Sequence, residues 1–263
     1  MFESKDHTFV ICAYKESPFL NDCIESLLKQ NLKTNIIMTT STPNSHIKKL
    51  AEHFNIRLFV NDISAGIASD WNFAYEHAGS KLVTLAHQDD VYCVDYAARA
   101  LDAINHALSP LIFFSDYREL RSEESIDKNR VLSVKRLLLK PLKAERRQNS
   151  VFWRRRVLSL GSAICCPTVT CVRQALPSPL FNDCFKTNLD WEAWERVSKQ
   201  EGTFIYCPDV LVYHRIHEGS TTSELIRDNT RNNEDLEMFR RFWPKPIAGF
   251  LNLFYSLAQK SNF

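Results

Sequence analysis

The sequence predicts an α/β fold in which helices flank a mostly parallel sheet. From residue 8 to residue 115, short apolar segments alternate strictly with segments that have the periodicity of a helix. Such alternation indicates βαβ crossovers, which place parallel strands side by side and cover both faces of the sheet. The chain has 263 residues, no internal repeat and no Gly/Ser linker, which suits one large domain with an appendage.

Five strands are expected in this first part, because each apolar run is bounded by polar or turn-forming residues. They cover Thr8–Ala13, Asn35–Thr39, Ile56–Val60, Leu82–Ala86 and Leu111–Phe114. Apolar residues spaced three and four apart predict helices between them, at about 18–30, 47–54, 66–78 and 94–108. Ser17-Pro18 supplies a start signal for the first helix.

The alternation breaks after residue 115. Residues 116–125 are polar and are expected to form a loop. We then expect strands at Ala163–Cys166 and Thr168–Cys171, a helix at Leu189–Lys199, and short strands at Thr203–Tyr206 and Val210–His214. Residues 224–263 predict two C-terminal helices, the second of which suits either the core or a membrane surface.

Bulk composition narrows the class of protein. The first residues, MFESKDHTFV, lack the apolar core of a secretory signal, and the eight cysteines form no CxxC pair. We therefore expect a cytoplasmic protein with reduced cysteines. The net charge of +2 gives no overall field for nucleic acid, and nucleic-acid binding is not expected.

Two adjacent carboxylates, Asp89 and Asp90, follow the fourth strand in the segment His87-Gln88-Asp89-Asp90. The carboxyl ends of parallel strands form the ligand-binding edge of an open α/β sheet. The carboxylates could therefore bind a divalent cation that holds a phosphorylated substrate. Alternatively, one caps the next helix and the other is simply solvated.

The absence of phosphate-binding glycine loops favours the metal. The sequence contains neither GxGxxG nor GxxxxGK[ST], and it has only six glycines. Backbone amides therefore cannot wrap a phosphate closely, so a cation must neutralise much of its charge. Carboxylate and phosphate oxygens suit Mg²⁺ or Mn²⁺.

Later residues could join this site. His214 and His217 lie in the segment HRIH just after a strand, where a histidine could ligate the metal or merely face solvent. Asp190 begins a helix, where it could act as a general base or simply favour the helix dipole.

Basic residues dominate the segment 128–156, where Glu145 is the only acid, and large apolar residues are interleaved with them. Such a mixture suits an anionic membrane surface. The alternative is a solvated surface whose apolar residues pack on the main domain.

Five segments of the chain, taken in order, resemble family 2 glycosyltransferases with the GT-A fold. The segments are TFVICAYKES, SPFLNDCIESLLKQ, AHQDDVY, LDWEAWERV and YHRIHEGSTT. The chain is most similar to bacterial members that build surface polysaccharide and lipopolysaccharide. The resemblance implies a transferase domain at 1–223, in which 1–115 binds the nucleotide sugar and 116–223 forms the acceptor half, followed by C-terminal helices at 224–263.

The resemblance also implies roles for particular residues. Asp190 would deprotonate the acceptor hydroxyl in an inverting reaction, and Asp89 and His217 would contact Mn²⁺ or Mg²⁺. The donor, with a UDP-sugar expected first, would be bound by Ala13, Tyr14, Glu16, Asn72, His87, Gln88 and Asp90. The acceptor would be a glycan or a lipid-linked molecule, so that the enzyme could lie on the inner face of the membrane.

Three departures from the family pattern stand out. His87 replaces the first Asp of the DxD element, Trp71 replaces an Arg that faces the diphosphate, and Thr39-Thr40-Ser41 lacks the Asp that reads uracil. Because His87 replaces an acid, the protein could alternatively be a non-catalytic subunit that binds a sugar nucleotide. A sugar-nucleotide nucleotidyltransferase is another alternative, although Ala13-Tyr14-Lys15-Glu16 lacks the glycines that it would need. A plain interaction protein would bind no metal-dependent ligand.

Overall fold

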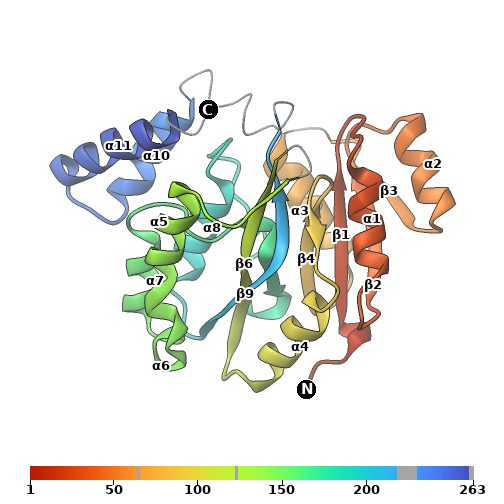
Figure 1. The fold of residues 1–263 in the computed structure, drawn as a ribbon, viewed down its shortest axis with the longest axis horizontal. Helices are drawn as coiled ribbons and strands as arrows, with labels where there is room; N and C mark the ends of the chain where they lie inside the picture. The colour runs from red at the N-terminus through yellow and green to blue at the C-terminus, as the bar shows by residue number, and fades with distance from the viewer. Residues whose placement is uncertain (64–65, 122–123, 218–229, 261–263) are drawn as a thin grey trace.

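The structure is a computed structural model that describes residues 1–63, 66–121, 124–217 and 230–260 (Figure 1). Its first half is the expected parallel sheet. The strands are β1 (His7–Ala13), β2 (Asn35–Thr40), β3 (Arg57–Val60) and β4 (Leu82–His87), adjacent in the order β3-β2-β1-β4. All three ladders between them are parallel, so the carboxyl ends of these strands share one edge.

Helices cover both faces of this half. The helices are α1 (Leu20–Leu28), α2 (Ser45–His53), α3 (Ile67–His77) and α4 (Tyr96–His106). Successive residues of β1 point to opposite faces: Phe9 and Ile11 pack into the core beneath α1, α2 and α4, and Val10 into the core beneath α3. From Phe9 to Ala13 the strand is apolar because both of its faces are buried.

The second half extends the sheet. Its strands are β5 (Val91–Tyr92), β6 (Pro110–Arg121), β7 (Glu124–Ile126), β8 (Val169–Val172) and β9 (Thr203–Arg215). The order continues β4-β8-β6-β9-β5, with β7 paired to β6. Strand β8 runs antiparallel between β4 and β6, whereas β6 and β9 form a long parallel ladder. The sheet is therefore mostly parallel, as the sequence predicted.

The prediction of a loop at 116–125 was wrong, because β6 continues to Arg121 and β7 pairs with it. Polar residues are tolerated in this strand because their buried groups have partners. The Asp116 carboxylate accepts hydrogen bonds from the Tyr117 amide and Arg136, and the Glu119 carboxylate accepts them from Asn129 and Arg121.

Two other predicted boundaries differ. Ala163–Cys166 is not a strand, because a 3₁₀ turn over Cys166–Thr168 precedes β8 and Pro167 cannot donate to a ladder. The two short strands predicted between Thr203 and His214 are one strand, β9, which follows β6 through irregularities in their register.

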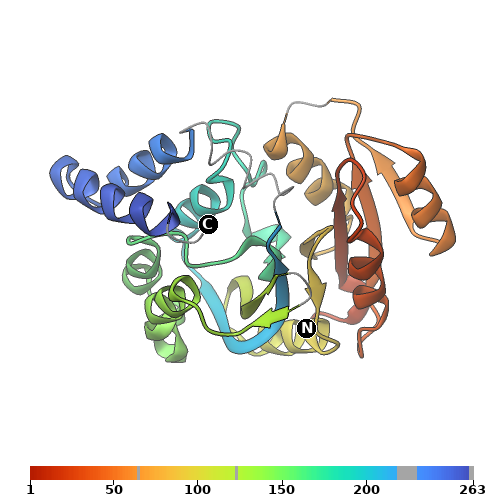
Figure 2. The ribbon, with the colours of Figure 1, turned by 45° about the horizontal axis from the view of Figure 1, so that its top comes forward.

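The remaining helices lie at one end of the molecule. They are α5 (Arg130–Leu139), α6 (Glu145–Gln148), α7 (Val151–Leu158), α8 (Leu189–Val197), α10 (Thr230–Arg240) and α11 (Lys245–Lys260), with a 3₁₀ turn over Lys140–Lys143. Figure 2 shows α10 and α11 beside α8 and α7. The predicted helix from 224 begins outside the described residues. None of the helices in the described ranges has the length and apolar character needed to cross a membrane.

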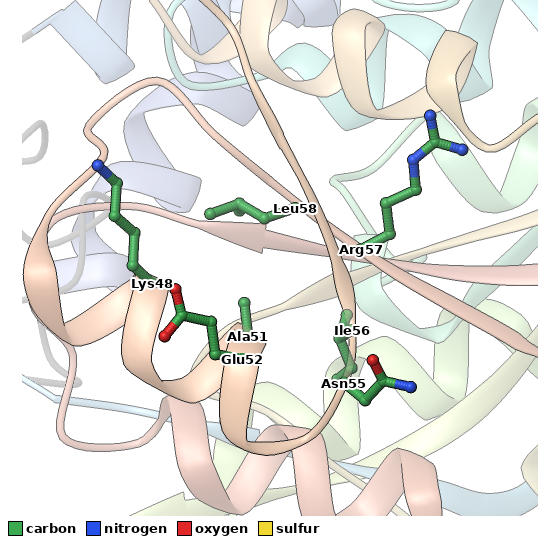
Figure 3. A pocket seen from close by; sticks show the side chains of 7 residues that line it. All are labelled: Lys48, Ala51, Glu52, Asn55, Ile56, Arg57 and Leu58. Atoms are coloured by element: carbon green, nitrogen blue, oxygen red, sulfur yellow. The ribbon is translucent and has the colours of Figure 1, made fainter.

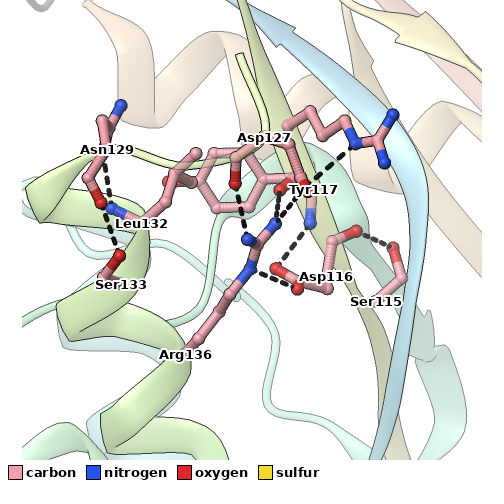
Figure 4. A network of polar contacts seen from close by, with 9 residues as sticks. Ser115, Asp116, Tyr117, Asp127, Asn129, Leu132, Ser133 and Arg136 are labelled. Carbon is pink, nitrogen blue, oxygen red and sulfur yellow. Dashed lines mark hydrogen bonds and ion pairs between the residues drawn. The ribbon is translucent and has the colours of Figure 1, made fainter. Parts of the chain in front are cut away.

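Many basic residues of segment 128–156 are used inside the fold. Arg136 donates to the carboxylates of Asp116 and Asp127 and to the Tyr117 carbonyl, which ties α5 to β6 (Figure 4). Arg154 has no exposed surface and donates to the carbonyls of Gln200 and Gly202. This part of the segment is therefore packed structure rather than a solvated basic arm.

Replacing Arg154 with methionine should lower the free energy of unfolding by about 2–4 kcal/mol, because Arg154 is fully buried and its hydrogen bonds to the carbonyls of Gln200 and Gly202 are lost. Urea unfolding followed by circular dichroism measures this change. Arg146, which is exposed in the same segment, provides the control, and Arg146→Met should stay within about 0.5 kcal/mol of the parent. Equal stability of the two variants would contradict the structural role of Arg154.

Candidate active site

The turn between β4 and β5 gathers three groups that can ligate a cation. One ligand atom from each of His87, Asp89 and Asp90 lies within 4.8 Å of the others. Asp90 has no exposed surface, whereas His87 and Asp89 are partly exposed. The group lies at the carboxyl end of β4, which is the edge where the sequence placed it.

Strand β9 brings further residues to this turn across more than 120 positions of sequence. The β5–β9 ladder places the end of β9 beside Asp90. Nδ1 of His214 lies 2.9 Å from Asp90 Oδ1, and the backbone amide of Arg215 donates to the same oxygen at 2.9 Å. Nε2 of His217 lies 3.0 Å from Asp89 Oδ2. The structure thus joins the predicted pair of Asp89 and His217.

Within the described part of the chain, two buried atoms of the group have no hydrogen-bond partner: Oδ2 of Asp90 and Nε2 of His87. Burying such atoms is unfavourable unless something binds them. Carboxylate oxygens favour Mn²⁺ or Mg²⁺, and an imidazole nitrogen is accepted by softer divalent ions. The residues present therefore fit a divalent cation.

The surroundings keep Asp89 ionised. Burial by itself raises the pKa of the Asp89 carboxyl, but the hydrogen bond from His217 and the nearby His87 and His214 outweigh it and hold that pKa below its ordinary value. Burial lowers the pKa of His214, but the hydrogen bond and charge of Asp90 together with the charge of Asp89 outweigh it and raise that pKa overall. The turn therefore keeps the negative charge that a cation needs.

Asp190 lies in the first turn of α8 and is half-buried. Its Oδ1 accepts a hydrogen bond from the Trp191 amide at 2.7 Å. Burial raises the pKa of Asp190 above the ordinary carboxyl value, although the Trp191 amide and the positive charges of Lys135, Arg231 and His87 partly oppose this. Asp190 therefore lies within electrostatic reach of His87.

The predicted donor-binding residues have different environments. The Gln88 side chain makes two hydrogen bonds of 2.9 Å to the backbone of Tyr14, which joins the ends of β4 and β1. Tyr14 and Glu16 are exposed beside this junction, and Ala13 is buried at the end of β1. Both ends of the Asn72 side-chain amide are occupied, because it donates to the Phe181 carbonyl at 2.7 Å and accepts from the Phe181 amide at 3.0 Å.

Three further residues contribute to the site, and sequence reasoning did not place two of them, Arg215 and Lys135, there. Trp71 stacks on His87 with ring centroids 5.1 Å apart. Arg215 donates to the Asp89 carbonyl and to the Asp22 carboxylate. Lys135 on α5 lies 3.0 Å from the Tyr117 hydroxyl, and the Tyr117 ring touches that of His214.

The motif HRIH could have suggested Arg215, because it lies between the two histidines. No sequence signal identifies Lys135, which reaches the site only because α5 folds back over β6.

A hollow between α2 and β3 is lined by Lys48, Ala51, Glu52, Asn55, Ile56, Arg57 and Leu58 (Figure 3). It lies at the amino end of β3, whereas the site lies at the carboxyl end of β4. Since these strands belong to one parallel sheet, the hollow is at the opposite edge and is not part of the site.

Comparison with known proteins identifies the family. Residues 8–158, more than half of the chain, match the family described as Glycosyl transferase family 2. The chain therefore belongs to glycosyl transferase family 2, and it is a glycosyltransferase with the GT-A fold that the sequence predicted. No curated protein matches the chain.

Solved structures share this fold at low sequence identity. One is S. aureus TarS, residues 1–349, in complex with UDP-GlcNAc, with a TM-score of 0.62 and 12% identity over 94% of this chain and 70% of that one. Another is the mannosyltransferase PcManGT from Pyrobaculum calidifontis in complex with GDP-Man and Mn²⁺, with a TM-score of 0.62 and 13% identity over 94% of this chain and 68% of that one. In a longer structure of TarS, the match covers only 43% of the relative.

Replacing Asn72 with alanine should lower the free energy of unfolding by about 1–3 kcal/mol, because two hydrogen bonds to Phe181 are lost. Chemical denaturation measures this change, and Asn233→Ala, at an exposed position, is the control. Affinity for a nucleoside diphosphate should change little. Unaltered stability together with weakened nucleotide binding would instead support the donor contact that the sequence predicted.

Proposed function

We propose that the protein is a metal-dependent, inverting glycosyltransferase. It would move a sugar from a nucleotide-diphosphate sugar to a hydroxyl of a glycan or lipid-linked acceptor in cell-surface polysaccharide synthesis. The observation that carries this proposal is the group of His87, Asp89 and Asp90 at the ligand-binding edge, with His217 on Asp89. We assign donor binding to residues 1–115 and the acceptor half to residues 116–223.

The donor would lie across the ends of β1 and β4. Tyr14 and Glu16 would contact its nucleoside, while Asp89 and His217 would hold the cation. When bound, Mn²⁺ or Mg²⁺ would supply positive charge for the diphosphate as it leaves. The fold relatives support this class of donor, because they are seen with UDP-GlcNAc, UDP and GDP-Man, and one also with Mn²⁺. A UDP-sugar is the first candidate.

Asp190 would accept the proton of the acceptor hydroxyl as that oxygen attacks the anomeric carbon from the face opposite the diphosphate. Attack from that face inverts the configuration. Burial and a raised pKa suit a carboxylate to this role, because they increase its basicity. The half-buried position leaves part of the side chain accessible to an acceptor.

A lipid-linked acceptor would place the enzyme at the inner surface of the membrane, as a cytoplasmic, peripheral protein. Segment 128–156 still offers an exposed mixture for an anionic surface, although several of its arginines are used within the fold. Leu137 and Phe152 are about two-thirds exposed, and Lys140, Lys143 and Arg146 are exposed near them in sequence. Flotation with anionic liposomes at low salt tests this part, and a protein that stays at the bottom would remove it.

A non-catalytic sugar-nucleotide-binding subunit is the second candidate. The observation that favours it is His87, which stands where the family has an acid and is stacked on Trp71. Such a subunit would bind a donor in the presence of metal but would neither transfer nor hydrolyse it. Turnover of any nucleotide sugar decides between the two.

Asp89→Ala should abolish the increase in melting temperature that a nucleotide sugar produces with Mn²⁺, because the cation loses a carboxylate ligand. The assay is a thermal-shift panel of nucleotide sugars, with and without Mn²⁺ and after EDTA. Asp102→Ala removes an exposed acid on α4 and serves as the control. A Mn²⁺-dependent shift that persists in Asp89→Ala would refute the metal assignment.

Asp190→Asn should leave donor affinity nearly intact and cut turnover by about 10²-fold or more. In the parent enzyme, turnover should fall as pH drops through the raised pKa of Asp190, so the acidic limb of the pH–rate profile should lie above the ordinary carboxyl value of about 4.

The raised pKa of Asp190 also predicts an effect on stability. A carboxyl whose folded pKa is raised loses stabilisation as pH rises through that pKa. Asp190→Asn should therefore be more stable than the parent at pH 7, and normal turnover would show that Asp190 is not the base.

A further inference from the structure

The loop that leads into Asp190 is held by a carboxylate from a distant helix. Glu234, on α10, is buried and accepts backbone hydrogen bonds from three successive residues of this loop. Its Oε1 accepts from the Lys186 amide at 2.7 Å, and its Oε2 accepts from the amides of Thr187 and Asn188 at 2.9 and 3.0 Å. The Thr187 hydroxyl also donates to Oε2. One side chain thus defines the path of the chain two residues before Asp190.

The next residue of α10 adds a second attachment. Asp235 has no exposed surface, and its Oδ1 accepts a hydrogen bond from the Asn188 side-chain amide at 2.7 Å. Asn188 is the N-cap residue of α8, but its side chain makes no capping bond to its own helix. The beginning of α8 is therefore organised by α10 rather than by its own sequence.

Electrostatics explains why carboxylates occupy this place. The first N–H groups of a helix lack partners within the helix, and together they form its positive end. A carboxylate that accepts several converging N–H groups makes charge-assisted hydrogen bonds, which are stronger than neutral ones. Of the three amides that Glu234 accepts from, that of the N-cap residue Asn188 belongs to this positive end, and those of Lys186 and Thr187 belong to the loop before it. Glu234 therefore attaches this loop and the start of α8 to another helix, next to the residue on which the proposed chemistry depends.

The residue that follows α10 also contacts α8. Arg241, just after α10, donates to the Glu192 carboxylate at 2.9 Å and lies 3.6 Å from that of Glu195. Both acids are buried on α8. Helix α10 thus contacts α8 at its beginning and along its length, which restrains both translation and tilt.

We propose that Glu234 is a positioning residue that holds Asp190 in place for catalysis. This inference rests on the proposed function, in which Asp190 is the general base. Proton transfer requires the carboxylate within hydrogen-bond reach of the acceptor hydroxyl, and displacements of about 1 Å can reduce rates about 10²-fold. Helix α10 then contributes to the position of the base, because its Glu234 holds the loop that leads into Asp190.

The test compares Glu234→Gln with Glu237→Gln, an exposed position on the same helix. The glutamine keeps the size of the side chain but turns one acceptor oxygen into a donor that faces backbone N–H groups. Turnover is measured as nucleoside diphosphate released from UDP-GlcNAc or GDP-mannose with Mn²⁺, and affinity as binding of UDP or GDP. Glu234→Gln should lower kcat at least about tenfold with unchanged nucleotide affinity, whereas Glu237→Gln should match the parent.

Hydrogen exchange supplies a readout that does not depend on activity. The amides of Lys186, Thr187 and Asn188 should exchange slowly in the parent and at least about tenfold faster in Glu234→Gln, because they lose their acceptor. Ile104→Ala, a truncation of a buried residue on α4 in the other hydrophobic core, controls for a general loss of stability. It should lower the melting temperature and leave both kcat and these amides unchanged.

An unchanged kcat in Glu234→Gln would overturn the proposal. A loss of kcat that merely follows melting temperature, and that Ile104→Ala shares, would overturn it as well. Fast exchange of the three amides in the parent would refute the attachment of this loop to Glu234. Failure of the proposed function has a different signature, since Asp190→Asn would then keep full turnover or the parent would turn over no donor.

Discussion

The buried carboxylate of Asp90 is the point on which the site depends. It has no exposed surface, and one of its oxygens bonds His214 and the backbone of Arg215. A buried negative charge is stable only with such partners. These bonds join the turn after β4 to the end of β9, and they place His217 on the neighbouring Asp89. Without them, the carboxylates that we assign to the cation would have no fixed geometry.

A second group of buried charges places the proposed base. The acids of α8 pair with arginines from α7 and the end of α10, and acids of α10 bond the loop before α8. Each carboxylate buried here has a donor from another element, which is how a charged helix can be packed against its neighbours. The same arrangement leaves Asp190 at the start of α8, where its carboxylate accepts a hydrogen bond from the Trp191 amide and interacts electrostatically with Lys135, Arg231 and His87.

The basic residues of segment 128–156 illustrate how one pattern can serve several purposes. Their charges suggested a membrane-binding or solvated surface. In the structure, Arg136 joins α5 to β6 and Arg154 is fully buried. Lys135 donates a hydrogen bond to the Tyr117 hydroxyl, beside the site. A helix folded over the sheet sends successive side chains in different directions. Charge composition alone therefore does not distinguish a solvated residue from a structural or a site-lining one.

The sequence by itself determined the parallel half of the sheet, the ligand-binding edge and the carboxylates on it, because strand–helix alternation and apolar runs are local signals. It could not reveal that Asp116 and Glu119 continue β6, since their partners come from α5 and its N-terminal flank. Nor could it show that Asn72 bonds Phe181, or that Glu234 accepts hydrogen bonds from the loop before Asp190. Only the tertiary structure decided these contacts, because each joins residues that are distant in sequence through hydrogen bonds without a local periodic signature.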